Sequence, residues 1–347
     1  MLAVPVNRRV LVTTGAFISI GALLTGCTPG DDATNTQPTN ASAEGNQAEG
    51  DTVVIGFSGP AADHGWLGAI NAAALATAEE FPDIDLRVAE GTNDANLQIS
   101  QVEQFINDGV DAIVLLPTDG AALTPVATQA MEAGIPVINV DREFSSSFAA
   151  RATVLGDNYG MGVSAGTYIC EKLGGNEDAV VAEIAGIDSL PLTQDRSQGF
   201  ADALESCGLD VDNRVAADFT VQGGEATTSQ LLSAAPKIDA IWNHDDDQGI
   251  GVLAAIDNAG RDDFFMVGGA GSANAMREIQ SGESVLEATV IYPSTQAADG
   301  IRMARLIAQD KAMSDLVEVE VPKRVVLNAP VVTSDNVDRY LPTAFES

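Results

Sequence analysis

Two neighbouring stretches of the chain decide its fold class. Residues 109–119 read Gly-Val-Asp-Ala-Ile-Val-Leu-Leu-Pro-Thr-Asp, and residues 134–142 read Gly-Ile-Pro-Val-Ile-Asn-Val-Asp-Arg. Each holds an apolar run of strand length, and an amphipathic stretch of helical character separates them. Gly109 and Gly134 can close the preceding helices, and Pro136 can start a strand. The two stretches therefore predict consecutive units of a parallel α/β sheet.

The same alternation of strands and helices continues along the chain from residue 52. We expect strands over residues 52–58, 84–90, 111–116, 135–140, 152–155, 179–185, 214–219, 238–243, 264–269 and 285–291. Helices are expected in the gaps, for example over residues 66–80, 95–108, 121–133, 159–172 and 195–206. At about 150 residues per domain, this length accommodates two domains. The pattern predicts an α/β protein with two doubly wound parallel-sheet lobes.

The composition excludes several classes of function. The 347 residues include 17 Lys and Arg against 50 Asp and Glu, a formal net charge of −33 at pH 7. Such a chain repels a phosphate backbone, so we expect no nucleic-acid partner. We expect neither an enzyme nor a cofactor, because His64 and His244 are the only histidines and no nucleophile–base–orienter set accompanies them.

Two short motifs allow both a functional and a structural interpretation. The run His-Asp-Asp-Asp at residues 244–247 suggests a metal site. Its carboxylates are contiguous, unlike the spaced ligands of a calcium loop, so we favour capping of the next helix and expect no metal. The run Gly-Met-Gly-Val-Ser-Ala at residues 160–165 matches a dinucleotide-binding fingerprint. We favour close helix packing by its small residues.

The N-terminal residues resemble a bacterial lipoprotein signal. Two arginines precede a short apolar stretch at residues 10–27, which ends in Leu-Thr-Gly-Cys. We expect residues 1–27 to be this signal, with lipid attached to Cys27; an ordinary signal peptide with a chance cysteine is the alternative. Residues 28–51 contain almost no large apolar side chains, so we expect a disordered linker there.

Two cysteines remain after Cys27, at positions 170 and 207. In an exported protein such a pair can form a disulfide, and both Cys170 and Cys207 fall near the C-terminal ends of predicted helices that flank one strand. Two buried thiols that act as small apolar side chains are the alternative. The sequence leaves this choice open.

Polar side chains gather where the predicted strands end, in the runs 62–66, 92–94, 141–143 and 244–247. The carboxyl ends of parallel strands form the ligand-binding edge of doubly wound sheets. Aspartates accept hydroxyl hydrogens, arginine donates through a rigid fork, and a flat indole covers a sugar ring. The expected cleft has mainly Arg142 and Arg196 as cations, which favours a neutral polyhydroxylated ligand.

These features, in this order and at this spacing, resemble the ribose, xylose and galactose class of solute-binding proteins of ABC transporters. The resemblance covers residues 52–345 and is strongest between Gln101 and Arg142. It implies the periplasmic binding protein type 1 fold, in which two lobes joined by three crossovers close on the ligand. We expect the crossovers near residues 156, 292 and 322, and the lobes at 52–156 plus 293–322 and at 157–292 plus 323–347.

The resemblance also guides the choice of ligand-site residues. Its Asp-Arg pair, which holds sugar hydroxyls, falls on Asp141 and Arg142. The other candidates are Trp66, Asp63, Arg196, Phe219, Asp245, Asn93 and Tyr292. A surface ion pair is the alternative for Asp141 and Arg142, and a plain core position is the alternative for Trp66. Two positions depart from the family pattern: Ala270 stands where an aspartate is common, and Tyr292 aligns loosely with a glutamine.

These observations predict the solute-binding receptor of an ABC importer. The ligand is a monosaccharide or sugar alcohol, with a pentose or pentitol favoured, which the receptor delivers to membrane permease subunits. The alternative is an extracellular sugar or autoinducer sensor that feeds a signalling partner. We expect a monomer held by the lipid on Cys27 at the extracytoplasmic face of the cell membrane.

Overall fold

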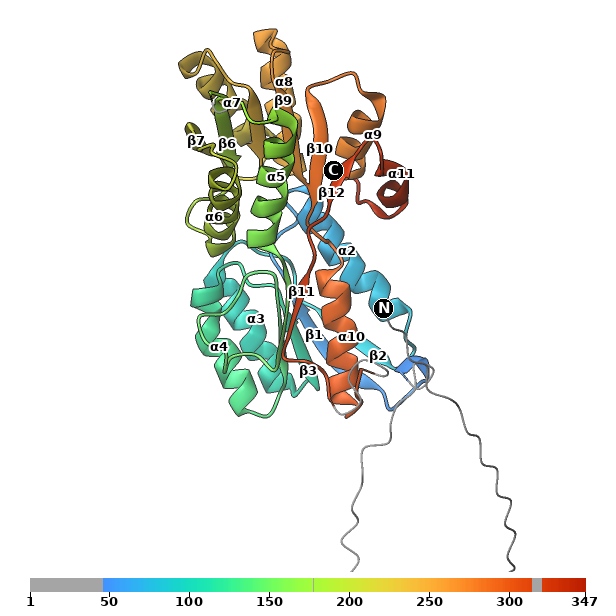
Figure 1. The fold of residues 1–347 in the computed structure, drawn as a ribbon. Helices are drawn as coiled ribbons and strands as arrows, with labels where there is room; N and C mark the ends of the chain where they lie inside the picture. The colour runs from blue at the N-terminus through green and yellow to red at the C-terminus, as the bar shows by residue number, and fades with distance from the viewer. Residues whose placement is uncertain (1–45, 177, 314–319) are drawn as a thin grey trace, which may run out of the picture. The chain divides into compact units, whose positions relative to one another are not determined.

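Two six-stranded sheets form the centres of two α/β lobes in the computed structural model, which describes residues 46–176, 178–313 and 320–347 (Figure 1). Sheet A contains, in spatial order, β11 (Arg324–Leu327), β5 (Ala152–Gly156), β4 (Val137–Val140), β3 (Ala112–Leu115), β1 (Val53–Ser58) and β2 (Ile84–Val88). Sheet B contains β12 (Val331–Thr333), β10 (Leu286–Ile291), β9 (Phe265–Ala270), β8 (Ala240–Asn243), β6 (Val181–Ala185) and β7 (Asn213–Ala216). Neighbouring strands run parallel except β12, which is antiparallel to β10. The predicted pair of doubly wound lobes is confirmed.

Helices cover both faces of each sheet. In the first lobe, α2 (Gly65–Glu79) and α10 (Gln296–Ala308) pack on one face of sheet A, and α3 (Ala95–Asp108) and α4 (Gly120–Glu132) pack on the other. In the second lobe, α5 (Asn158–Leu173) and α6 (Pro191–Glu205) cover one face of sheet B, and α7 (Val221–Ala234) and α8 (Asp246–Ala259) cover the other. The short helices α9 (Ala273–Ser281), α11 (Val337–Tyr340) and η1 (Leu341–Thr343) pack beside β12 and one another.

The two strands that decide the fold are buried on both faces. Every residue of β3 and β4 is buried. Val114 and Val140 belong to the core formed with α2 and α10, whereas Ile113 and Val137 belong to the core formed with α3 and α4. Parallel strands that are covered on both sides appear as continuous apolar runs, which explains why the sequence identifies them.

Several helices begin at an aspartate that follows a strand. The side chains of Asp94, Asp119, Asp157 and Asp245 accept backbone N–H groups in the first turns of α3, α4, α5 and α8. The first N–H groups of a helix have no intrahelical acceptor, so these carboxylates stabilise the helix starts. The predicted capping of α8 is confirmed, and polar residues collect at the strand ends.

Three passages join the lobes. The first follows Gly156, and the second lies between β10 and α10, both close to the expected positions. The third lies between β11 and β12 rather than near residue 322. Residues 324–327 pair with β5 and so belong to the first lobe, which corrects the expectation that residues 323–347 lie in the second. β11 is an edge strand with alternately exposed residues, so it lacks the continuous apolar run that marks the central strands.

The end of the expected linker is held against the first lobe. Arg305 donates hydrogen bonds to the backbone carbonyls of Asn46 and Ala48 at 2.7 and 2.8 Å. The expectation of disorder over residues 28–51 is therefore wrong for residues 46–51. The segment is fixed through its backbone carbonyls rather than through apolar side chains, and side-chain composition does not reveal this.

The predicted signal segment is not part of the described structure. Residues 1–45, which include Cys27 and most of the expected linker, lie outside it. Within residues 46–176, 178–313 and 320–347, no helix has both the length and the apolar character that crossing a bilayer requires.

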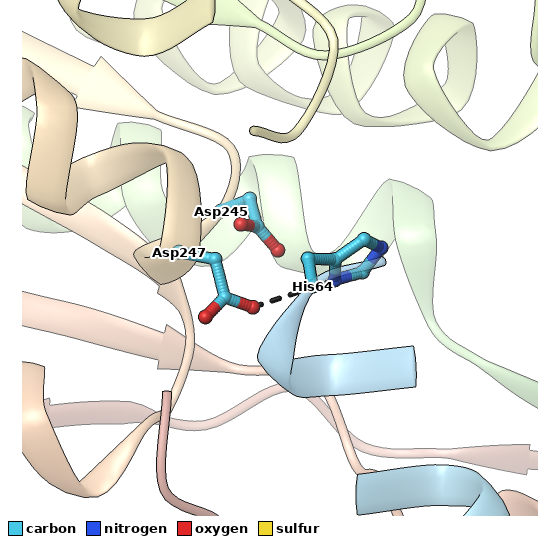
Figure 2. Close-up of side chains that lie close together, drawn as sticks. All are labelled: His64, Asp245 and Asp247. Carbon is cyan, nitrogen blue, oxygen red and sulfur yellow. Dashed lines mark ion pairs between the residues drawn. The ribbon is translucent and has the colours of Figure 1, made fainter. Parts of the chain in front are cut away.

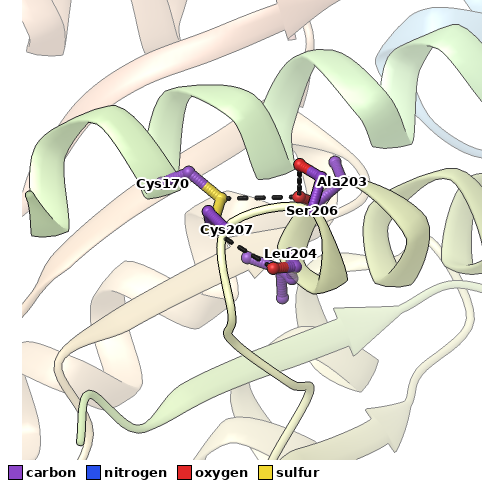
Figure 3. The surroundings of a disulfide bond; sticks show 5 residues. All are labelled: Cys170, Ala203, Leu204, Ser206 and Cys207. Carbon is purple, nitrogen blue, oxygen red and sulfur yellow. Dashed lines mark hydrogen bonds between the residues drawn. A yellow bond between two sulfur atoms is a disulfide. The ribbon is translucent and has the colours of Figure 1, made fainter. Parts of the chain in front are cut away.

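A disulfide joins α5 to the segment after α6 (Figure 3). Cys170 and Cys207 form it, with their α-carbons 6.1 Å apart, so the structure settles the choice that the sequence leaves open. The two helices also approach closely, because a β-carbon on Gly162 would lie 2.0 Å from the carbonyl oxygen of Arg196. The run at residues 160–165 thus serves helix packing and brings α6 close to the start of α5.

A buried ion pair joins α10 to the residue before β2. Arg305 Nε and Nη2 donate to the two carboxylate oxygens of Asp83 at 2.7 and 2.6 Å. Gln309 Nε2 and the Gly50 N–H also donate to this carboxylate, at 2.8 and 2.7 Å. Burial favours the neutral carboxyl, but these donors outweigh it and hold the pKa of Asp83 well below its usual range.

We predict that Asp83→Asn lowers the free energy of unfolding by about 3–5 kcal/mol, because it leaves Arg305 buried without a counter-charge. The control is Glu80→Gln, which removes the neighbouring exposed Arg302–Glu80 pair and should cost about 0–1 kcal/mol.

The contribution of Asp83 to the free energy of unfolding should also depend on pH. Because the folded-state pKa of Asp83 is depressed, this contribution is complete above a pH of about 4 and declines as the pH falls further. Urea unfolding at pH 7 and pH 3 measures both effects. Equal losses in the two variants would contradict the prediction.

Candidate ligand-binding cleft

Tyr292 lies at the centre of the contacts between the lobes. It follows β10 at the second passage and is 3% exposed. Its hydroxyl donates a hydrogen bond to Asp141 Oδ1 and accepts one from Asn158 Nδ2 at 3.1 Å. The guanidinium carbon of Arg196 lies 4.4 Å from the centroid of the phenol ring, and the centroid of the Trp66 ring lies 5.3 Å from it. Side chains from both lobes therefore meet on one tyrosine.

Asp141 and Arg142 follow β4 in the first lobe. Asp141 is buried and has a φ of 63°, a left-handed conformation that aspartate tolerates better than most residues. Arg142 Nη1 donates to the carbonyl of Thr118 at 2.8 Å. Arg142 Nε lies 3.8 Å from Asp141 Oδ2 and is buried, with no hydrogen-bond partner in the described part of the chain. The pair thus consists of a buried carboxylate and a partly buried arginine that has one unsatisfied donor among the described residues.

Arg196 extends from α6 of the second lobe into this group of contacts. Its Nε donates to Asn158 Oδ1 at 2.9 Å, and its Nη1 donates to the carbonyl of His244 at 3.2 Å. The ring of Phe219, which follows β7, has its centroid 5.9 Å from the guanidinium carbon. Arg196 thus lies within cation–π distance of both Phe219 and Tyr292.

A histidine of the first lobe meets two aspartates of the second (Figure 2). His64 Nδ1 lies 3.4 Å from Asp247 Oδ2, and this oxygen also accepts the Trp66 N–H at 3.0 Å. Asp245 caps α8 by accepting the Gln248 N–H at 3.0 Å. Asp247 therefore caps the start of α2 from the other lobe, where the helix dipole favours negative charge.

The residues His64, Asp245 and Asp247 include donor types that can hold a metal ion, with ligand atoms within 4.8 Å of one another. Burial lowers the pKa of His64, but Asp247 and Asp245 outweigh burial and raise it overall. Burial and the charge of Asp247 raise the pKa of Asp245 to about 6. The raised pKa of His64 favours the imidazolium, which pairs with carboxylates and does not ligate metals. That no metal binds remains a prediction.

Asp63 and Asn93 form an exposed rim beside this group. Asn93 Nδ2 donates to Asp63 Oδ2 at 2.9 Å, and His64 Nε2 lies 3.8 Å from Asp63 Oδ1. The two rim residues lie on the loops after β1 and β2. Contacts through His64 and Asp247 connect this rim with Trp66, and Asp245 lies beside the same two residues.

A cavity of about 360 Å³ lies between the lobes beside Asp141. Arg142, Gly156 and Asn158 line it together with Asp141, and the start of α6 closes it from the second lobe. Its volume is at the lower end of the roughly 300–1,000 Å³ typical of small-molecule sites. Tyr292 contacts three of these lining residues and so lies behind this part of the cavity wall.

Three residues that are not among the predicted site residues bond to them: Asn158, Asp247 and Gln248. Asn158 comes shortly after β5, so the strand-end rule that selects Asp141 also selects its position. Asp247 and Gln248 lie in the first turn of α8, where helix capping already accounts for an acidic residue. Gln248 accepts the Phe219 N–H at 2.9 Å, a contact that only the folded structure reveals.

Comparison with known protein families agrees with this architecture. A sequence profile of the periplasmic binding protein domain matches residues 55–312. The chain belongs to the periplasmic binding protein family. Membership of this family indicates a location outside the cytoplasm.

Individual members of the family cover most of the chain. The ribose import binding protein of Bacillus subtilis is 31% identical over 243 residues, which cover 68% of this chain and 77% of that protein. A crystal structure of a galactofuranose binding protein has a TM-score of 0.75 and 25% identity, and the match covers 84% of this chain and 97% of that one. The fructose-binding periplasmic domain of a hybrid two-component system has a TM-score of 0.73 and 27% identity, and the match covers 84% of this chain and 93% of that domain. These relatives are binding proteins rather than enzymes.

We predict that Gly156→Ala lowers the free energy of unfolding by about 1–3 kcal/mol, because a β-carbon there would lie 2.0 Å from the Tyr292 ring. Gly68→Ala in α2 is the control: the added carbon would meet no atom within 4 Å in the described ranges. Alanine should stabilise that helix by roughly 0.5–1 kcal/mol. Urea unfolding of both variants measures the difference. A Gly156→Ala protein as stable as the wild type would show that the phenol ring does not fill this space.

Proposed function

We propose that the protein is the solute-binding receptor of an ABC importer and captures a small neutral sugar or sugar alcohol between its lobes. The observation that carries this proposal is the cavity beside Asp141 and Arg142. Arg142 Nε is a buried donor that has no partner among the described residues, and it lies 3.8 Å from Asp141 Oδ2. A ligand hydroxyl can accept from the arginine and donate to the carboxylate at once. The relatives named for ribose import and galactofuranose binding support a sugar, and the small cavity supports a pentose or pentitol.

The charges around the cavity favour a neutral ligand over an anion. Five acidic side chains and two arginines line it: Asp119, Asp141, Glu143, Asp157, Asp195, Arg142 and Arg324. Arg324 is paired with Glu143, and burial together with the charge of Glu143 raises the pKa of Asp195. A sugar acid or sugar phosphate would meet an excess of negative charge, whereas hydroxyl groups can donate to the carboxylates.

Closure of the lobes around the ligand is the proposed mechanism. Three passages connect the sheets, and bending them would leave both sheets intact. Asp247 and Trp66 bond across the lobes, and Tyr292 contacts Asp141 and Arg196 from opposite lobes. On closure, such contacts would exclude water from the ligand and strengthen its hydrogen bonds. The closed form would then present both lobes to the permease.

The receptor would act from a membrane anchor outside the cytoplasm. We infer that lipid on Cys27 tethers a monomeric receptor beside its permease, and the lipoprotein-like signal at residues 1–27 supports this. Residues 46–51 dock on the first lobe, so the tether would end at Asn46.

A sensor that feeds a signalling partner is the second candidate function, favoured by the likeness to the fructose-binding domain of a hybrid two-component system. The two functions differ in their partner. An importer receptor loaded with sugar should stimulate ATP hydrolysis by its reconstituted permease–ATPase complex. A loaded receptor that leaves this hydrolysis unchanged would favour the sensor.

A thermal-shift panel of pentoses, hexoses and alditols tests the ligand class. A sugar that binds only the folded state stabilises it by about 2.7 kcal/mol at one hundred times its Kd. We predict a higher melting temperature with at least one neutral sugar or alditol, and none with the corresponding aldonic acids and sugar phosphates. If no neutral sugar or alditol raises the melting temperature, the proposed function is wrong.

Asp141→Asn tests the proposed role of the carboxylate. We predict a loss of roughly 10- to 100-fold in sugar affinity, the contribution of a hydrogen bond to a charged group. Folding should be retained, because asparagine also tolerates a positive φ. The control is Asp310→Asn, since Asp310 has a φ of 52° but is exposed after α10. Isothermal titration with the sugar found in the panel measures both, and unchanged affinity in Asp141→Asn would remove Asp141 from the site.

A further inference from the structure

Tyr292 forms hydrogen bonds with polar groups between the lobes. Its hydroxyl donates to Asp141 Oδ1 and accepts from Asn158 Nδ2, while Asn158 Oδ1 accepts from Arg196 Nε. The amide of Asn158 is therefore engaged within the protein on both its polar atoms. Asp141 keeps its second oxygen, Oδ2, on the side of Arg142.

The phenol of Tyr292 is also fixed from several directions. Its backbone N–H donates to the carbonyl of Ala270 at 3.0 Å, and its own carbonyl accepts Trp66 Nε1 at 3.1 Å. A β-carbon on Gly156 would lie 2.0 Å from the ring, so the absence of a side chain at Gly156 makes room for it. Burial and the charge of Asp141 raise the pKa of the phenol, so it stays a neutral donor at ordinary pH.

These contacts are of the kind by which proteins hold sugars. A hydroxyl between a carboxylate and an amide, on a ring that lies against a guanidinium and an indole, makes the interactions expected of a bound polyol. Tyr292 supplies this arrangement from the protein itself. Tyr292 and its neighbour Ala270 are also the two positions at which the sequence departs from the family pattern.

We infer that Tyr292 is a specificity-determining residue that permanently fills part of the space between the lobes and limits the ligand to the size of a pentose. This inference rests on the proposed sugar-binding function. The sugar occupies the cavity lined by Asp141, Arg142 and Asn158, with the phenol behind the wall. Asp141 offers the sugar its Oδ2, because Oδ1 is held by Tyr292. A hydroxymethyl group directed at Tyr292 finds no room.

Shortening this side chain opens the cavity towards Trp66 and Arg196, the two side chains that flank the phenol. The best probes are sugar pairs that differ by one hydroxymethyl group on the same pyranose ring. Such pairs are D-ribose with D-allose, D-xylose with D-glucose, and L-arabinose with D-galactose. A difference of this size typically changes affinity by about 10- to 200-fold in a tight pocket.

The experiment is isothermal titration of the full folded protein, wild type and Tyr292→Leu, with all three pairs. We expect the wild type to prefer the pentose of the pair that it binds. In Tyr292→Leu the ratio of hexose to pentose affinity should rise by at least about tenfold. Tyr292→Met gives the same measurement with a more flexible side chain if the leucine variant does not fold.

Tyr168→Leu is the control, because Tyr168 packs on Phe265 in the second lobe and its hydroxyl bonds to Glu287. This variant should leave the affinity ratio unchanged. An unchanged ratio in the Tyr292 variants, or a wild type that binds a hexose as tightly as its pentose, would overturn the inference and leave the proposed function standing. If neither the wild type nor the variants bind any neutral sugar or alditol, both the inference and the proposed function are wrong.

Discussion

The hydroxyl of Tyr292 donates a buried hydrogen bond to Asp141, and this bond ties the end of β4 to the second passage between the lobes. It holds Oδ1 of Asp141, a residue whose backbone φ is 63°, and leaves Oδ2 beside Arg142. The same hydroxyl accepts a hydrogen bond from Asn158 Nδ2, and Asn158 Oδ1 accepts one from Arg196 Nε of the second lobe. In a buried, low-dielectric setting such linked bonds reinforce one another. One tyrosine therefore links the cavity wall, part of the contact between the lobes and the placement of Arg196.

The sequence predicts the fold wherever burial leaves a clear pattern. β3 and β4 lie in the middle of sheet A and are buried on both faces, so they appear as apolar runs between turn residues. β11 and β12 lie at sheet edges, are short and carry partly exposed residues, and no comparable pattern marks them. Residues 46–51 are held by Arg305, a residue remote in sequence, through carbonyl groups that every residue possesses.

The sequence predicts candidate residues for the site, but it does not predict the contacts that these residues make. The rule that parallel strands end at one edge identifies Asp141, Trp66 and Asp245, because each follows a strand closely. The same rule does not show which polar groups are taken up by the protein itself. The Tyr292 hydroxyl bonds to Asp141 and Asn158, and Asp247 caps a helix of the opposite lobe. Such contacts depend on the distance between loops that are far apart in sequence, and no local pattern carries that information.

The most direct test is a crystal structure of the protein with the sugar that gives the largest thermal shift. We predict density for the sugar between the lobes, within hydrogen-bond distance of Asp141 Oδ2 and Arg142, with the Tyr292 hydroxyl still bonded to Asp141 Oδ1. A sugar bound away from Asp141, or a Tyr292 side chain turned out of the space between the lobes, would contradict this arrangement.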